Sequence, residues 1–261
     1  MPFVRCNDIN LYYEIHGQGT PLLFLNGLSS DIAQRTPFID AAKKGLKIII
    51  PDIRGAGLTD KPHNAYSIAQ FTRDAYELVG NLSFKKINVM GFSMGGLVAI
   101  NFTVDHPELV DKLILVSTKP SWSKPFGCSD EAMRIFHSTD ISDALLKDLF
   151  HLIYGSRYRK LVSAEEYVRK RMADPNPQPI HGYLNQLNAC EKFDMLEKVK
   201  TIRKPTLIIA GKEDHFISPE NSYWMHDHIA DSKLIEYDGV GHLPVDECPE
   251  RLAKDVINFL S

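Results

Sequence analysis

The stretch Gly91-Phe92-Ser93-Met94-Gly95 decides the fold of this 261-residue chain. It follows an apolar run, Ile87–Met90, and precedes a run that can form a helix, Gly96–Ile100. A G-x-S-x-G sequence between a strand and a helix places its serine on a sharp, strained turn. A serine hydroxyl is a weak nucleophile at neutral pH and needs a base to take its proton. We therefore expect Ser93 to be a catalytic nucleophile with partners elsewhere in the chain.

The composition excludes several classes of protein. Hydrophobic residues make up 44% of the chain and charged residues 24%, which is ordinary for a globular protein, and the net charge of −3 gives no reason to expect a nucleic-acid partner. The N-terminus lacks the apolar region of a signal peptide, and no apolar stretch reaches the ~18 residues of a membrane span. The four cysteines form no C-x-x-C pair, and H-E-x-x-H is absent. We expect free thiols in a cytoplasmic protein, with no metal site and no membrane partner. The sequence is compatible with a homodimer and with a monomer.

Short apolar runs alternate with helical patterns along most of the chain. Uninterrupted Ile, Val and Leu are typical of strands buried on both faces, and helices between such strands imply parallel crossovers. Residues 3–6 and 9–16 are expected to form a hairpin. The pattern predicts an eight-stranded, mostly parallel sheet flanked by helices. The other six expected strands are Pro21–Asn26, Lys47–Pro51, Lys86–Met90, Lys112–Val116, Thr206–Ala210 and Lys233–Tyr237, with helices near 32–44, 67–82, 94–105, 218–230 and 249–260.

Residues 119–200 interrupt this alternation. They contain no convincing strand, and their helical stretches lie near 129–138, 142–154, 163–173 and 180–190. We expect a core domain of residues 1–118 and 201–261, and a helical cap, residues 119–200, inserted after the sixth strand. Such an insertion would lie over the carboxyl ends of the strands, where ligands bind in open α/β sheets.

His242 is the predicted base. It follows the last expected strand, and the glycines of Gly239-Val240-Gly241 let its loop turn back toward Ser93. His215 is the best rival among the other nine histidines.

Asp214 is the predicted acid that orients this base. It follows the strand that ends at Ala210 and precedes a plausible helix start, Ser218-Pro219-Glu220. Glu213 is the nearest competitor, and Asp238 is the next. The predicted nucleophile, acid and base then follow one another along the chain in the order Ser, Asp, His.

An oxyanion hole is expected from two backbone N–H groups. One belongs to Met94, the residue after the nucleophile, and the other belongs to the loop after the third strand. Leu28 is the predicted donor in that loop, because Gly27 lets the chain turn the Leu28 amide inward.

These segments together resemble the α/β-hydrolase superfamily, in the branch of small esterases, perhydrolases, enol-lactonases and carbon–carbon bond hydrolases. Asp52–Asp60 resembles the family's D-x-R-G-x-G-x-S-D loop, and His242-Leu243-Pro244 with Glu247 resembles its last loop. The resemblance covers nearly the whole chain outside the cap and implies the α/β-hydrolase fold. One departure is Asn26, where the family usually has histidine. Enol-lactonases often have asparagine there, so Asn26 indicates either a lactone substrate or a neutral exchange.

The expected function is that of a serine esterase, a carboxylic ester hydrolase that works through an acyl-enzyme and needs no cofactor. Its partner would be a small-molecule ester or lactone with a small to medium apolar group, because the cap is rich in large apolar side chains. Alternatives are an enol-lactonase, a carbon–carbon bond hydrolase, a cofactor-free perhydrolase or haloperoxidase, and a non-enzymatic ligand receptor. The candidate substrate-binding residues are Asn26, Trp122, Phe126, Phe136, Phe150 and Tyr154.

Overall fold

The computed structural model describes residues 2–123 and 126–261. Within them, eight strands form one sheet in the order β1-β2-β4-β3-β5-β6-β7-β8. Strands β3 to β8 pair in parallel, and β1 and β2 pair antiparallel at one edge. The expected mostly parallel, eight-stranded sheet is confirmed. The bounds are β1 (Phe3–Cys6), β2 (Ile9–His16), β3 (Thr20–Leu25), β4 (Leu46–Pro51), β5 (Ile87–Phe92), β6 (Val110–Val116), β7 (Thr206–Gly211) and β8 (Ser232–Tyr237).

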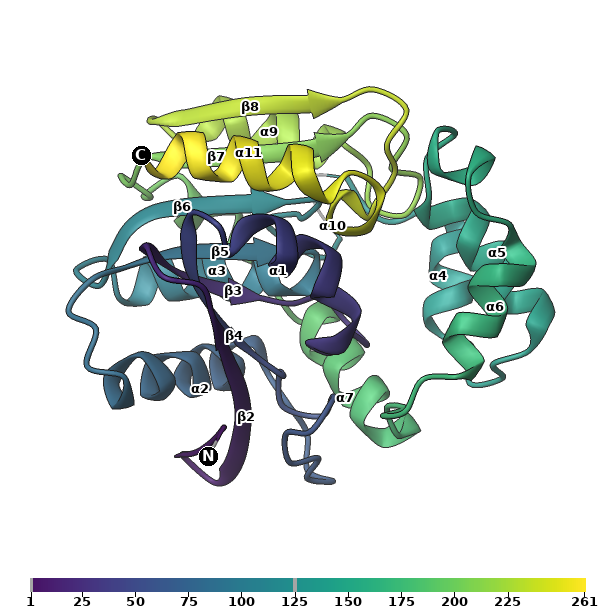
Figure 1. The fold of residues 1–261 in the computed structure, drawn as a ribbon, viewed down its shortest axis with the longest axis horizontal. Coiled ribbons are helices and arrows are strands. Elements are labelled where there is room, and N and C mark those ends of the chain that lie inside the picture. The colour runs from purple at the N-terminus through teal and green to yellow at the C-terminus, as the bar shows by residue number, and fades with distance from the viewer. Residues whose placement is uncertain (1, 124–125) are drawn as a thin grey trace.

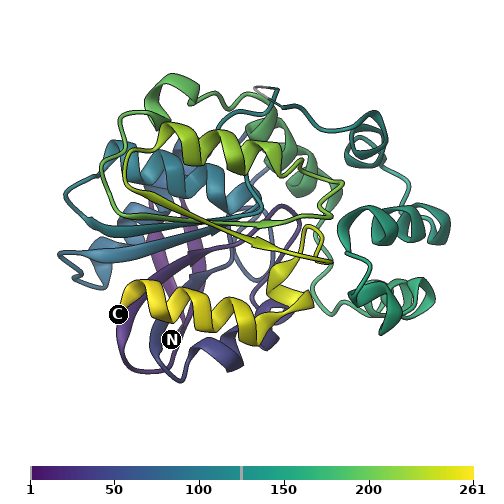
Figure 2. The ribbon, with the colours of Figure 1, turned by 90° about the horizontal axis from the view of Figure 1, so that it is seen from above.

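Helices cover both faces of the sheet, as Figures 1 and 2 show. One face carries α1 (Thr36–Ala42) and α11 (Pro249–Leu260), and the other carries α2 (Ile68–Asn81), α3 (Met94–Asp105) and α9 (Glu220–His228). The helix expected near 32–44 is in fact a 3-10 turn, Ala33–Arg35, followed by α1. Pro37 accounts for the break, because proline lacks an N–H and is best placed in the first turn of a helix.

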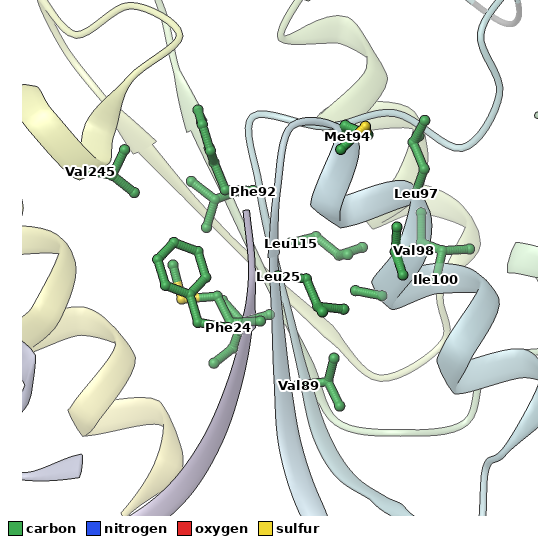
Figure 3. Packing of buried hydrophobic residues seen from close by; sticks show 14 of the residues in the cluster. Phe24, Leu25, Val89, Phe92, Met94, Leu97, Val98, Ile100, Leu115 and Val245 are labelled. Atoms are coloured by element: carbon green, nitrogen blue, oxygen red, sulfur yellow. The ribbon is translucent and has the colours of Figure 1, made fainter. Parts of the chain in front are cut away.

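The central strands are buried on both faces. Every residue of β5 is buried, and Figure 3 shows why: Phe24 and Val245 pack on one side of the sheet, and Leu97 and Val98 of α3 pack on the other. Fully burying a side chain of this size contributes roughly 1.5–3 kcal/mol. The end of β5, where Ser93 lies, is therefore held by a dense core.

The cap forms helices near the expected positions, namely α4 (Asp130–Phe136), α5 (Asp143–Ile153), α6 (Ala164–Met172) and α7 (Ile180–Glu191). Ser129, Ser142 and Ser163 cap the first three of these helices by accepting a backbone N–H three residues later. Short elements escaped prediction: a 3-10 turn, Tyr158–Lys160, and the helices α8 (Leu196–Val199) and α10 (Pro244–Glu247). Their length gives too few turns for a periodic pattern.

The two ends of the cap lie side by side. An isolated β-bridge joins Ser121 to Asp194, and the Trp122 N–H donates to the Phe193 carbonyl at 3.1 Å. Between these ends, α4, α5 and α6 lie beyond the carboxyl ends of the strands (Figure 1). Among the described residues, no helix combines the length and the apolar character needed to cross a bilayer.

Candidate active site

Ser93 occupies a strained turn between β5 and α3. Its φ of 52° lies in the left-handed region, which costs energy for a residue with a side chain. The turn is possible because its neighbours are glycines: a Cβ on Gly95 would overlap the Leu25 carbonyl, and a Cβ on Gly91 would overlap the Gly95 carbonyl. The elbow thus fixes the hydroxyl at the end of the central strand.

His242 contacts both of its predicted partners. Its Nε2 lies 3.0 Å from Ser93 Oγ, and its Nδ1 lies 2.8 Å from Asp214 Oδ2. All three side chains are at least nine-tenths buried. The cap also holds this loop, because the His242 N–H donates to the Ile153 carbonyl at 2.6 Å. The geometry is that of a nucleophile, a base and an orienting acid.

The orientation of Asp214 is fixed by its own loop. Its second oxygen, Oδ1, accepts the N–H groups of Phe216 at 3.0 Å and Ile217 at 2.8 Å. These bonds leave Oδ2 for the imidazole. Because both oxygens are used, the carboxylate cannot rotate without breaking a bond.

The rival acids, Glu213 and Asp238, and the rival base, His215, have other surroundings. Glu213 accepts from the Ser156 N–H at 2.6 Å and from its hydroxyl at 2.8 Å, and these bonds lower the pKa of Glu213. Asp238 pairs with Lys212 at 2.9 Å on the surface, and His215 is exposed. Of the candidate acids, it is therefore Asp214 that contacts the imidazole.

The loop of residues 26–30, here called the oxyanion loop, lies directly against the nucleophile. A Cβ on Gly27 would lie 3.3 Å from the Cβ of Ser93. Within the described residues, the Leu28 N–H donates to no protein atom. The Met94 N–H is at the first position of α3, where a helix leaves its N–H groups without an acceptor. Both predicted oxyanion donors are thus free to bind a ligand.

The side chain of Asn26 braces this loop. Its Oδ1 accepts from the Gly27 N–H and from Arg35 Nε, and its Nδ2 donates to the Asp31 carbonyl, at 2.8 to 2.9 Å. Asn26 is 1% exposed. The expectation that Asn26 contacts substrate is therefore replaced by a positioning role, because its polar atoms are engaged within the protein. The side chain also gives no support to the lactone interpretation.

Two residues that the sequence did not single out, Arg35 and Gln186, anchor the oxyanion loop. Arg35 donates to Asn26 Oδ1, to Ser30 Oγ and, at 2.7 Å, to Asp246 Oδ1 of α10. Gln186 of the cap accepts the Ser29 N–H at 3.3 Å. Neither residue belongs to a motif, so only their contacts reveal them.

An aromatic row leads from the cap to the base. Trp122 packs on Phe136 with ring centroids 5.1 Å apart, Phe136 packs on Phe216 at 4.3 Å, and Phe216 packs on His242 at 5.1 Å. Two predicted substrate-binding residues, Trp122 and Phe136, thus belong to an apolar wall that reaches the imidazole. Phe216, which touches His242 directly, was not predicted.

The other predicted cap residues lie elsewhere. Phe150 is 1% exposed and packs against Tyr154 and Tyr167, so it stabilises the cap itself. Tyr154 is buried, stacks on Tyr158, and donates its hydroxyl to Asp246 at 3.3 Å, and burial raises its pKa. Phe126 is exposed. Phe150, Tyr154 and Phe126 thus lie outside the aromatic row that reaches His242, and their contact with substrate stays a prediction.

Glu247 fastens the base loop to the cap. Its carboxylate accepts the N–H groups of Gly241, Leu243 and, from the cap, Gly155. Burial raises its pKa to about 7 despite these three donors. The loop that carries His242 is therefore held by a titratable group.

A cavity of about 290 Å³ is lined by none of the triad residues. Glu14, Asp31, Asp40 and Asp52 are among the residues that line it. Asp52 accepts the N–H groups of Ile32 and Leu58, which gives it a structural role. The described residues contain no cluster of His, Cys, Asp and Glu that could hold a metal ion.

The fold and the site define a hydrolase of the α/β type. A sequence profile of the α/β hydrolase fold matches residues 20–249, and the chain belongs to this family. It is 27% identical over 249 residues to a putative carbamate hydrolase, RutD, of Azorhizobium caulinodans. The aligned region covers 93% of this chain and 91% of that protein.

Two further proteins are similar to this chain. A poly(3-hydroxyalkanoate) depolymerase of Ectopseudomonas oleovorans is 26% identical, with 92% of this chain and 84% of that protein covered. An esterase of Exiguobacterium antarcticum has a similar structure, with a TM-score of 0.87, 24% sequence identity, and coverage of 99% of this chain and 98% of that chain. This last similarity shows the fold alone.

Proposed function

We propose that the protein is a serine hydrolase that cleaves carboxylic esters of small to medium apolar substrates. The observation that carries the proposal is the position of His242, within hydrogen-bond distance of both Ser93 and Asp214. The names of two similar proteins, a carbamate hydrolase and a polyester depolymerase, are consistent with acyl chemistry at such a site.

The reaction would take place in two steps. Ser93 attacks the ester carbonyl while His242 Nε2 takes the hydroxyl proton, and Asp214 stabilises the imidazolium that forms. The N–H groups of Leu28 and Met94 bind the oxyanion. The imidazolium then gives its proton to the departing alcohol, which leaves an acyl group on Ser93. Finally, His242 activates a water molecule that releases the acid and restores the serine.

The choice of an apolar substrate rests on the wall beside the base. Trp122, Phe136 and Phe216 are apolar side chains in an unbroken row that ends on His242. Apolar walls of this kind favour apolar acyl or alcohol groups, with specificity set by few polar contacts. Asn26 is engaged within its loop, so no residue here favours a lactone over an open ester.

The proposal is tested with p-nitrophenyl acetate and butyrate, a δ-lactone and a p-nitrophenyl carbamate, assayed side by side. We expect the two esters to give the highest kcat/KM, and Ser93→Ala to lower kcat by roughly 10⁴–10⁶ with an unchanged circular-dichroism spectrum. A fluorophosphonate probe should label the wild-type protein once and the variant not at all. A single turnover without steady-state release would indicate a ligand receptor, and a preference for the lactone or carbamate would overturn the ester assignment.

A further inference from the structure

Lys119 is a lysine buried without a carboxylate partner in the described part of the chain. It is 1% exposed, and no ion pair links it to an acidic residue described by the structure. Its Nζ donates to the Trp122 carbonyl at 2.7 Å and lies 4.1 Å from the centroid of the Trp122 ring. Lysine is almost never fully buried unless it is paired, so its remaining contact is of interest.

That contact is a thiol. Lys119 Nζ lies 3.0 Å from the Sγ of Cys128, within hydrogen-bond distance. Cys128 is partly exposed, and its neighbours Gly127 and Ser129 are exposed. Cys128 is therefore the more exposed residue of the pair, and Lys119 is the buried one.

The other three thiols are poor candidates for reaction. Burial raises the pKa of Cys6 and of Cys248 to about 12, and it also raises the pKa of the fully buried Cys190. A thiol reacts through its thiolate, so these three residues are protected by their surroundings. Cys128 differs from them because an amine donates to its sulfur.

We propose that Lys119 and Cys128 form a peroxide-responsive site, in which oxidation joins Nζ to Sγ through a covalent nitrogen–sulfur bond. A sulfenic acid condenses with a thiol or with a backbone nitrogen held beside it. The Lys119 amine is a nitrogen nucleophile placed in the same way, 3.0 Å from the Cys128 sulfur. The amine belongs to a buried residue, and the thiol belongs to a partly exposed one. The site uses no member of the catalytic triad, and it meets the apolar wall only at Trp122, which Lys119 contacts.

The chemistry requires one molecule of hydrogen peroxide for each bond formed. The Cys128 sulfur attacks peroxide, the O–O bond breaks, and sulfenic acid and one water form. The Lys119 ammonium gives a proton to solvent, and its neutral nitrogen then attacks the sulfur and displaces a second water. Sulfur is oxidised by two electrons and peroxide is reduced by two. The product carries two hydrogen atoms fewer than the thiol and neutral amine.

The test is peptide mapping of the full-length protein before and after stoichiometric hydrogen peroxide. Chymotrypsin cuts after aromatic residues, and Trp122 and Phe126 lie between the two partners, so the unmodified residues fall in separate peptides. After oxidation we expect one joined species, lighter by two hydrogen atoms than the two free peptides together. Dithiothreitol should return it to the separate peptides.

Three variants sharpen this test. Lys119→Arg keeps a cation but replaces the amine by a weakly nucleophilic guanidinium, and Cys128→Ser removes the sulfur, so neither should give the joined species. Cys190→Ser should give it as the wild type does. Oxidation of Cys128 only to sulfinic or sulfonic acid, with the Lys119 peptide unmodified, would overturn the proposal. So would a disulfide to Cys190, and if Lys119→Arg does not fold, the wild-type map and the two cysteine variants still decide.

Discussion

Replacing Arg35 with methionine is the most informative perturbation of this site. The guanidinium, on a side chain 3% exposed, makes bonds of 2.8 Å to Asn26, 2.9 Å to Ser30 and 2.7 Å to Asp246. It therefore ties both ends of the oxyanion loop to the helix that follows the base. Methionine keeps most of the aliphatic volume and removes all three donors.

The expected loss of stability follows from the burial of these partners. Removing one member of a buried ion pair costs roughly 3–5 kcal/mol, and the lower end applies because the Asp246 side chain is 20% exposed and can regain water. A loss of about 3 kcal/mol lowers Tm by roughly 6–12 °C in a domain of this size.

The expected loss of activity is smaller than the loss of a whole oxyanion donor, which costs roughly 10²–10³ in kcat. The loop retains the bond from Asn26 to the Asp31 carbonyl and the bond from Ser29 to Gln186. We therefore expect kcat for p-nitrophenyl butyrate to fall about tenfold, or ~1.4 kcal/mol, with little change in KM. The oxyanion exists only in the transition state, so its stabilisation affects kcat rather than KM.

Arg134→Met is the matched control. Arg134 pairs with Asp148 at 2.8 Å on the surface, where both side chains are about half exposed, and such pairs contribute roughly 0–1 kcal/mol. Its Tm and kcat should therefore stay close to those of the wild type. If Arg35→Met behaves like this control, the positioning role is refuted. A raised KM with unchanged kcat would instead indicate that Arg35 binds substrate.

Three further substitutions test the other supports of the site. Asp214→Asn should lower kcat by roughly 10⁴, because Oδ1 keeps its backbone donors and the new amide then faces His242 Nδ1, which imposes the wrong tautomer. Gln186→Leu should cost about 1–3 kcal/mol by calorimetry and lower kcat several-fold, because it removes the acceptor of the Ser29 N–H and strands a buried carbonyl. Glu247→Gln should flatten the dependence of stability on pH. In the wild type the folded protein binds this proton more tightly, with a pKa of about 7 against 4.5, so the free energy of unfolding should fall by up to about 3 kcal/mol as pH rises through that window.

Each of these has an outcome that contradicts it. A loss below tenfold in Asp214→Asn would exclude Asp214 as the orienting acid. A fall in Tm without any fall in kcat would make Gln186 a purely structural residue. Urea titrations between pH 4.5 and 7 would contradict the role of Glu247 if wild type and variant kept parallel profiles.

The sequence alone determined the sheet and the candidate nucleophile. Strands such as β5 and β7 are largely apolar, and a run of this kind is stable only when both of its faces are covered. The G-x-S-x-G motif is equally recognisable, since both of its glycines lie two residues from Ser93. The proposed base and acid were found because each follows a recognisable strand and must lie at the same edge of the sheet.

Only the tertiary structure decided which polar groups meet. Asp214 and Glu213 are neighbours in sequence, and the choice between them depends on the turn in which Asp214 accepts two N–H groups of its own loop. Gln186 and Ser29 are 157 positions apart, and Arg35 and Asp246 are 211 positions apart. Hydrogen bonds between aperiodic loops leave no pattern in a sequence, because they depend on how separately formed elements pack. That packing is what turned Asn26 from a candidate substrate contact into a brace of the oxyanion loop.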